Sequence, residues 1–202
     1  MAKTSKTTPT KDAARPDNRR TMILDEAARL FSTRGYESTS MRDIAAAVGM
    51  LPGSIYYHFP SKDDILAAIY TIGIDQILAA QEAALAAHAD PWDRLEAACA
   101  AHLDTLLGSE GYVAAIIGDW PSEAAQTRSH LIGERDRYEA IFRDLIKDLP
   151  DLRKQDRRVF RLMLLGALNW TLTWYRPGRQ TPSQIAREMV GVLRARHQPQ
   201  PS

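Results

Sequence analysis

Residues 19–66 read RRTMILDEAARLFSTRGYESTSMRDIAAAVGMLPGSIYYHFPSKDDIL, and they predict three short helices followed by the start of a fourth. Apolar residues recur at helical spacing between Ile23 and Phe31, with charged residues between them. Gly35 then supplies a C-terminal stop for this first helix. The rest of the chain is organised around this segment.

Caps and stops mark the second and third helices. Ser40 and Asp43 have the spacing of a shortened capping box, and Gly49 ends the second helix. Pro52 stands at or near the first position of the third helix, where a missing N–H costs nothing, and Pro60 ends that helix. A helix this short is unstable alone and must pack against the two before it. The pattern predicts a helix-turn-helix that presents one face of the third helix to a major groove.

This segment resembles the DNA-binding domain of the TetR family of transcriptional regulators, over about a quarter of the chain. The resemblance rests on many positions in fixed order and not on one short motif. The matching residues are Ile23, Leu24, Ala27, Ala28, Leu30, Phe31, Gly35, Tyr36, Thr39, Ser40, Ile44, Ala45, Val48, Gly49, Gly53, Tyr56, His58, Phe59, Ser61, Lys62 and Leu66.

The resemblance implies which side chains contact DNA. Tyr56, His58 and Lys62 occupy positions that usually grip phosphate in this family, whereas Tyr57 and the turn before the third helix lie near base edges. For Phe59 we expect the alternative, core packing, and for His58 the alternative is a capping or buried histidine. The candidate DNA-binding residues are Arg42, Leu51, Pro52, Gly53, Ser54, Tyr56, Tyr57, His58 and Lys62.

The overall charge does not indicate a nucleic-acid partner. The 202 residues carry a net charge of +1, and a hydrophobic content of 45% is enough for a sizeable core. The charge is uneven, because Lys and Arg outnumber Asp over the first twenty residues. We expect residues 1–16 to form a disordered basic arm that adds phosphate contacts. The alternative is a tail that only aids solubility.

Several classes of protein are not expected from the sequence. The single cysteine, Cys99, lies on an apolar helical face, which indicates a buried thiol and no disulfide framework. The chain has no apolar run long enough for a membrane span and no secretory signal, so we expect a cytoplasmic protein. No enzyme motif occurs, and the histidines lack the spacing of metal ligands. We therefore expect no catalytic residue, metal or cofactor; a helical enzyme would need a constellation that the sequence does not contain.

The chain beyond residue 66 is predicted to be helical almost throughout, so the fold class is all-α. We expect a DNA-binding domain at 17–64, a ligand-binding and dimerisation domain at 65–197 and a disordered tail at 198–202. Long helices are predicted from Ser122, from about Lys154 and from Thr181, where Thr-Pro-Ser-Gln forms a helix start. The last two have more apolar surface than one small bundle needs, which indicates a homodimer through both. The TetR resemblance implies the same, and packing within one subunit is the alternative.

Aromatic residues with a few polar groups in the larger domain indicate a ligand pocket between helices. The stretch LGALNWTLTWYRPGRQTPSQIA, residues 165–186, resembles TetR-type regulators that sense acyl-CoA thioesters. That resemblance implies that Arg176 or Arg179 meets the phosphates of coenzyme A. Ordinary core packing is the alternative for most of the aromatic residues. The candidate ligand-binding residues are His102, Trp120, Tyr138, Asn169, Trp170, Trp174 and Arg176.

Together these features predict a ligand-responsive repressor that a small hydrophobic effector, with an acyl-CoA thioester as one candidate, releases from a palindromic operator in double-stranded DNA. Two alternatives stay open. The effector of the repressor is a drug, a free fatty acid or an aromatic compound without coenzyme A, or the protein is a transcriptional activator.

Overall fold

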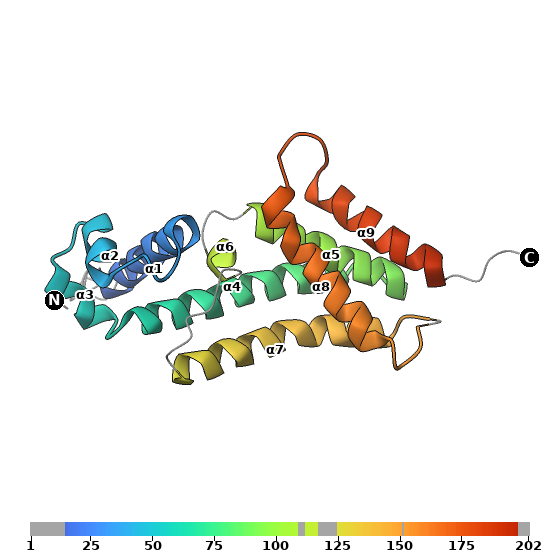
Figure 1. Ribbon diagram of the computed structural model, residues 1–202, viewed down its shortest axis with the longest axis horizontal. Helices are drawn as coiled ribbons and strands as arrows, with labels where there is room; N and C mark the ends of the chain where they lie inside the picture. Colours follow the sequence, from blue (N-terminus) through green and yellow to red (C-terminus); the bar gives the residue numbers. More distant parts are fainter. Residues whose placement is uncertain (1–14, 109–111, 117–124, 151, 198–202) are drawn as a thin grey trace, which may run out of the picture.

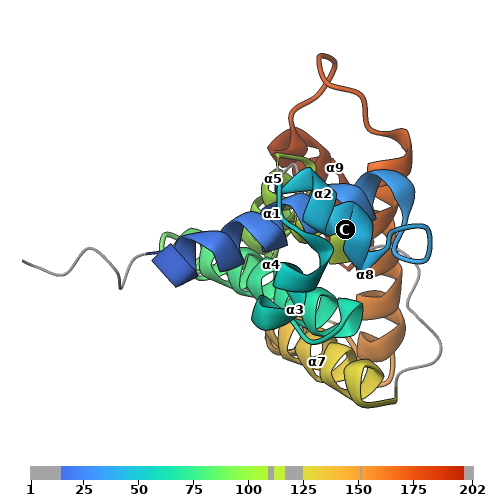
Figure 2. The ribbon, with the colours of Figure 1, turned by 90° about the vertical axis from the view of Figure 1, so that its left-hand side faces the viewer.

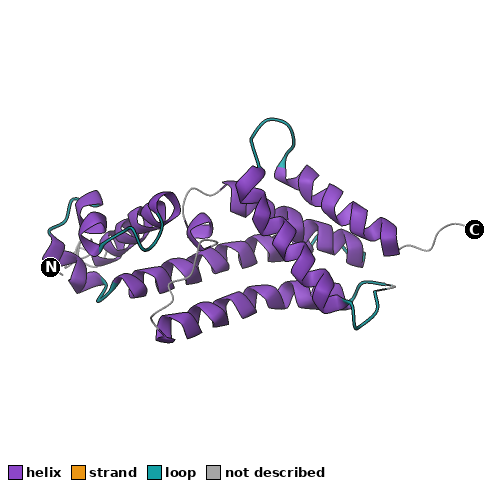
Figure 3. Cartoon of the chain, in the orientation of Figure 1, coloured by secondary structure: helices purple, strands orange, loops and turns teal. Residues whose placement is uncertain are grey.

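The computed structural model describes residues 15–108, 112–116, 125–150 and 152–197, and the regular elements in these ranges are all helices (Figure 3). One long helix and two short ones form a head at one end of an elongated molecule, and the other helices form the remainder (Figure 1). The all-α prediction is confirmed. No helix of the described ranges is long and apolar enough to cross a membrane.

The head consists of α1 (Arg15–Arg34), α2 (Met41–Ala47) and α3 (Pro52–His58), which Figure 2 shows from its outer side. α1 includes Arg15 and Pro16, the last two residues of the stretch 1–16 for which a basic arm was expected. Proline is tolerated at the start of a helix because the first N–H groups there have no partner within the helix.

The predicted caps and stops of the head are present. The side chain of Ser40 accepts from the backbone N–H of Asp43, while the carboxylate of Asp43 accepts from the N–H of Ser40, so the capping box is complete. Gly35 and Gly49 have φ angles of +85° and +66°, in the left-handed region that favours glycine. These turns let the chain reverse direction twice, so that α2 packs against α1 and α3 packs against α2.

α4 (Lys62–Leu85) is the element that joins the head to the rest of the molecule (Figure 1). Its N-cap is Ser61, whose hydroxyl accepts from the N–H of Asp64. α4 contacts α1 in the head and then α5, α6 and α7. A movement of α4 would therefore displace helices in both parts.

The larger part contains α5 (Pro91–Gly108), the short α6 (Tyr112–Ile116), α7 (Ala125–Lys147), α8 (Arg157–Trp174) and α9 (Pro182–His197). α9 packs along α5, while α7 packs against α4 and α8 crosses α5 and α7 (Figure 1). One apolar core runs from the head through this part. Its largest fully buried side chains include Phe59, Ile65, Ile69, Ile77, Leu95, Leu103, Leu106 and Phe142.

The helix starts of the larger part differ in how well the sequence predicted them. Thr181 and Gln184 form the predicted capping box of α9, with reciprocal bonds of 3.2 and 2.8 Å. α8 begins at Arg157 and not at Lys154, because the backbone forms a turn over 154–156 that Arg153 and Asp156 close by an ion pair. The predicted cap at Ser122 lies outside the described residues.

Candidate DNA-binding surface and ligand-binding interior

The outward face of α3 carries large side chains that no other part of the described chain covers. Tyr57 is 87% exposed, Leu51 is 76% exposed and Tyr56 is 52% exposed. Ile55 and Phe59 point the other way and are buried in the core. Aromatic and aliphatic side chains grouped on one exposed face are typical of a contact surface. The expectation that Phe59 packs in the core and Tyr57 does not is therefore in accord with their burial.

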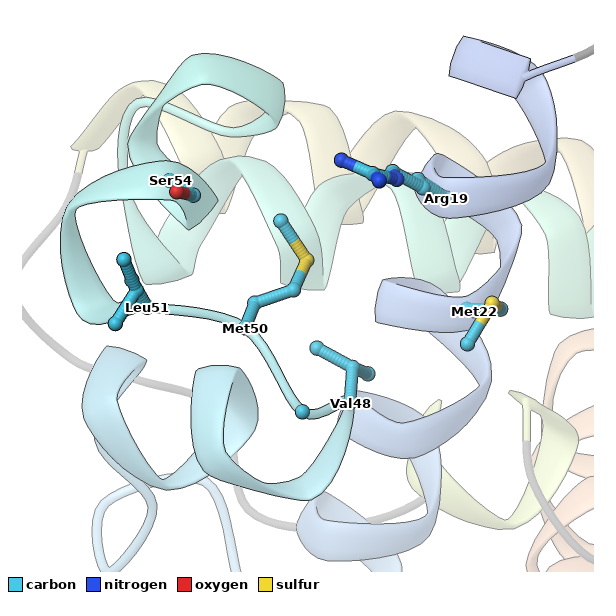
Figure 4. Close-up of a pocket in the computed structure, with 7 residues that line it drawn as sticks. Arg19, Met22, Val48, Met50, Leu51 and Ser54 are labelled. Carbon is cyan, nitrogen blue, oxygen red and sulfur yellow. The ribbon is translucent and has the colours of Figure 1, made fainter.

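A groove of about 390 Å³ lies beside this face, between α1 and the turn that leads into α3 (Figure 4). Thioether and aliphatic side chains form much of its wall, and Arg19 lies above it on α1 (Figure 4). Pro52, Gly53 and Arg42 are also exposed in the head. The candidate base-contacting turn therefore borders a hollow with mixed polar and apolar walls. The lining residues are Arg19, Met22, Val48, Gly49, Met50, Leu51 and Ser54.

Lys62 has protein partners in this structure. Its Nζ donates to the backbone carbonyl of Tyr36 at 2.8 Å and lies 4.0 Å from the centroid of the Tyr36 ring. The hydroxyl of Tyr36 in turn donates to Asp63. Burial and then this carboxylate raise the pKa of Tyr36 above its ordinary value. In the DNA-free chain, Lys62 thus ties the start of α4 to the loop before α2.

The end of α3 has a partner that the sequence reasoning missed. His58 is half-buried, and its ring meets that of Tyr57 edge-on at 5.3 Å. Its carbonyl accepts from Nη1 of Arg20 at 2.9 Å, and the guanidinium of Arg20 lies 4.0 Å from the centroid of Phe59. The sequence shows Arg20 only as one of several N-terminal cations, so no local pattern indicates this contact.

In the larger part, two of the candidate ligand-binding residues meet in the interior. The hydroxyl of Tyr138 on α7 is 3.2 Å from Nδ1 of His102 on α5, and both side chains are buried. Burial lowers the pKa of His102 to about 4, so its ring is neutral near pH 7. Because burial also keeps Tyr138 protonated, we assign its hydroxyl as the donor and Nε2 of His102 as the ring N–H.

Asn169 on α8 lies beside the same imidazole. Asn169 raises the pKa of His102, but by less than burial lowers it. Nε2 of His102 nevertheless has no hydrogen bond of ordinary geometry within the described ranges. A buried polar atom without a good partner is costly, so a hydrogen-bonding partner for Nε2 would stabilise this point of the interior. Three candidate residues from three helices therefore meet at one point in the interior.

The remaining candidates do not join this cluster. Trp170 is 64% exposed, Trp174 is also exposed, and Arg176 donates to the carbonyl of its neighbour Tyr175 at 2.7 Å. Trp120 lies outside the described residues. Helical geometry accounts for the division, because Asn169 faces α5 while Trp170, one position on, faces away.

The exposed side of α8 forms an apolar strip that the described chain leaves uncovered. Its members recur at helical spacing, and Val192 on the neighbouring α9 is exposed as well. Single exposed apolar residues are common on monomers, whereas a strip along a whole helix indicates a protein interface. The strip consists of Val159, Leu162, Met163, Trp170 and Trp174.

A polar contact links the two parts of the molecule. The hydroxyl of Tyr112 on α6 donates to Oδ1 of Asp25 on α1 at 2.5 Å, across 87 positions in the sequence. Burial and this bond raise the pKa of Tyr112, so the phenol remains a donor. The sequence alone carries no signal for this pair.

Within the described ranges, no group of histidine, cysteine and acidic side chains is arranged to hold a metal ion. Cys99 is buried, and burial raises the pKa of its thiol well above the ordinary value. The thiol is therefore protonated and poorly reactive near neutral pH.

Each part of the chain matches a known protein family. Residues 23–69 match the family described as bacterial regulatory proteins, tetR family, and residues 88–196 match the tetracyclin repressor-like, C-terminal domain. The HTH-type transcriptional repressor KstR2 of Rhodococcus jostii is 28% identical over 192 residues, which cover 92% of this chain and 94% of that protein.

Two solved structures are similar over most of their length. AibR in complex with isovaleryl coenzyme A and operator DNA superimposes with a TM-score of 0.77 and 31% identity, covering 86% of this chain and 97% of that one. The TetR family regulator PfmR from Thermus thermophilus gives a TM-score of 0.74 and 30% identity, covering 93% of this chain and 96% of that one.

Proposed function

This chain belongs to the TetR family of bacterial regulatory proteins, and from that membership we propose that it represses transcription as a homodimer on a palindromic operator and leaves the operator when a small hydrophobic effector binds. The family consists of regulators and not of enzymes, which agrees with the absence of an enzyme motif in the sequence. We assign residues 17–64 to DNA binding and 65–197 to effector binding and dimerisation.

The single observation that carries the DNA-binding assignment is the exposed face of α3. Tyr57 projects from a helix too short to fold alone, and Leu51 projects from its N-cap position, while the buried Ile55 and Phe59 hold the helix from behind. Such a helix offers contacts to base edges and thymine methyl groups in the major groove. Long polar side chains are few on α3, so we expect apolar and water-mediated contacts to share the specificity.

Dimerisation through α8 and α9 gives the uncovered strip a partner. In a two-fold dimer the same surface of each subunit faces its mate, so an apolar strip can bury itself against a copy. Two heads on one dimer then contact two half-sites, which is why we expect a palindromic operator.

For the effector site we propose the interior around His102, Tyr138 and Asn169. The N–H at Nε2 of His102 is placed to donate to an oxygen of a ligand, such as the carbonyl of a thioester. Support for an acyl-CoA comes from the similarity to AibR, which was crystallised with isovaleryl coenzyme A. Arg176 and Arg179 follow α8 and are exposed, as cations that meet phosphates would be.

The effector acts on DNA binding through α4 in this proposal. α4 begins in the head at Lys62 and passes the effector domain, and Tyr112 connects α6 to Asp25 of the head. An effector shifts the equilibrium only if it binds the DNA-incompetent arrangement better than the competent one. We expect that arrangement to separate the two heads by a distance that no longer matches successive grooves.

A gel-shift titration on the DNA upstream of the gene tests the head. Wild type is compared with Tyr56→Ala/Tyr57→Ala, which alters only exposed side chains and leaves the clamp of Lys62 intact. We expect the wild type to select this DNA over a scrambled duplex and the variant to lose that selection. Equal binding of both duplexes by the wild type would contradict the proposal.

A thermal-shift series tests the effector class. Acyl-CoAs, the matching free fatty acids, coenzyme A alone and an aromatic compound are each added to the protein. A ligand that binds the native state raises the melting temperature. At a hundred times its dissociation constant, it adds about 2.7 kcal/mol to the free energy of unfolding. Stabilisation by the thioester and not by the free acid or coenzyme A supports the acyl-CoA assignment, whereas stabilisation by the free acid alone favours an effector without coenzyme A.

A further inference from the structure

Arg20, in the second turn of α1, reaches across the head to the far end of α3. Its Nη1 donates to the carbonyl of His58 at 2.9 Å, and its guanidinium carbon lies 4.0 Å from the centroid of the Phe59 ring. The partners are 38 and 39 positions away in the sequence, so the contact is tertiary and joins two helices of the head.

α3 has a physical need for such a contact. The last carbonyls of a helix have no partner within it, and α3 is only seven residues long. A cation at this end satisfies a carbonyl and also opposes the negative end of the helix dipole. At the other end, Leu51 occupies the N-cap position and makes no side-chain cap bond, so α3 lacks that fixation.

The guanidinium suits this position better than an ammonium would. It is planar, so one face can lie on the Phe59 ring while an edge N–H donates to the His58 carbonyl. Phe59 is buried in the core, and the exposed Tyr57 stands just before these two residues. The contact therefore fixes the end of α3 that carries Tyr57.

We propose that Arg20 is a positioning residue for operator recognition, which sets the pose of α3 against α1 and acts on DNA through that helix. The proposal rests on the DNA-binding function proposed above. It differs from the expectation that the sequence supports, in which Arg20 belongs to a basic N-terminal run whose cations meet phosphates without regard to sequence.

The two roles separate in a salt titration. Arg20→Gln and the charge-matched control Arg19→Gln are titrated with an operator duplex and a scrambled duplex over a range of salt concentrations. For Arg20→Gln we expect a loss on the order of tenfold in operator affinity, little change on the scrambled duplex and an unchanged salt slope. A lost phosphate contact would instead weaken both duplexes and reduce the slope by about 0.9 for each contact. That result would overturn the proposal, as would unchanged operator affinity.

Arg20→Lys tests the geometry, because it keeps the charge but not the planar group. We expect it to restore only part of the operator affinity that Arg20→Gln loses. Full restoration would show that an ammonium can form the same clamp, as that of Lys62 does on Tyr36, and would overturn the requirement for a planar guanidinium.

Hydrogen exchange of the DNA-free protein provides a readout that does not depend on the operator. The amides of α3 should exchange faster in Arg20→Gln than in wild type or Arg19→Gln, since the clamp at the end of α3 is gone. Unchanged exchange in α3 would overturn the proposal. If the wild type failed to prefer its operator, the proposed function would fail, and faster exchange of α3 would still identify Arg20 as its clamp.

Discussion

Tyr57 and Phe59 stand two positions apart at the end of α3 and have opposite environments. Tyr57 is almost fully exposed and has the His58 ring beside it, whereas Phe59 is buried under the guanidinium of Arg20. The spacing of apolar residues in the sequence predicts Phe59 as core. The role of Tyr57 came from the family resemblance and stays a prediction.

Truncating these two side chains should affect different properties. Tyr57→Ala removes a side chain that supports no core contact, so we expect weaker operator binding by about 1–3 kcal/mol and an unchanged melting temperature. Phe59→Ala empties a core position and should cost about 3–5 kcal/mol of unfolding free energy. Denaturant unfolding and an operator titration of both variants check this, and a large loss of stability in Tyr57→Ala would contradict it.

The buried imidazole of His102 should make stability depend on pH. Its pKa is lowered from 6.5 to about 4 by burial, so the unfolded chain binds a proton that the native chain does not. The stabilisation is complete above pH 6.5 and is lost as the pH falls toward 4, by about 3 kcal/mol in total. Urea unfolding between pH 4 and 7.5 measures this. His102→Gln should flatten the curve over this window, and an equal slope in both proteins would exclude His102 as the source.

Among single residues, the sequence predicted those whose partners are local and missed those whose partners are distant. Ser40 and Asp43 are three positions apart, so their capping box could be predicted. Arg20 on His58 and Tyr112 on Asp25 depend on how whole helices pack. The sequence does not distinguish an arginine that is only solvated from one that binds the end of another helix.

At the scale of elements, helix starts marked by a capping side chain or by proline were predicted correctly, whereas a start with neither was not. α9 begins where Thr181 and Gln184 predict it, whereas α8 begins after a turn at 154–156 that has no side-chain cap. The first apolar residues of α8 are Val159 and Phe160, so periodicity alone does not say how far before them the helix begins. Capping side chains and proline thus locate helix starts, whereas apolar spacing alone does not.

The cap of α9 gives a direct prediction. Thr181→Ala removes the hydroxyl that accepts from the N–H of Gln184, and we expect a loss of about 1 kcal/mol in unfolding free energy. Thr33→Ala is the control, because its exposed hydroxyl bonds the carbonyl of Arg29 inside α1 and its removal should change stability by less than about 0.5 kcal/mol. Equal losses of unfolding free energy in the two variants, measured by urea denaturation, would show that the cap stabilises no more than the exposed hydroxyl of Thr33 does.

At the scale of the molecule, the sequence predicted the head and the all-α larger part, but not how the larger part arranges its polar residues. His102, Tyr138 and Asn169 come from three helices, and only packing brings them together. Trp170 and Trp174 share the aromatic character that suggested a pocket, yet they lie on the uncovered strip of α8. The aromatic composition indicates a pocket or an interface, and the helix face on which each residue lies determines which of the two it joins.

The uncovered strip predicts how the chain assembles. Met163→Glu places a charge at an exposed apolar position of α8, and we expect it to convert a dimer into monomers, since burying an unpaired charge is costly. Ala79→Glu, on the exposed side of α4, is the control and should stay dimeric. Sedimentation velocity at micromolar concentration measures both. A Met163→Glu protein that remains dimeric would place the interface elsewhere.

We propose that binding of the effector and binding of the operator weaken each other in this protein. The measurement that tests it is the operator dissociation constant of the wild-type protein, taken by fluorescence anisotropy with and without a saturating concentration of the ligand found by thermal shift. We predict that the effector weakens operator binding by about 1–3 kcal/mol, and that the operator weakens effector binding by the same factor. Equal operator affinity with and without the bound effector would contradict the account.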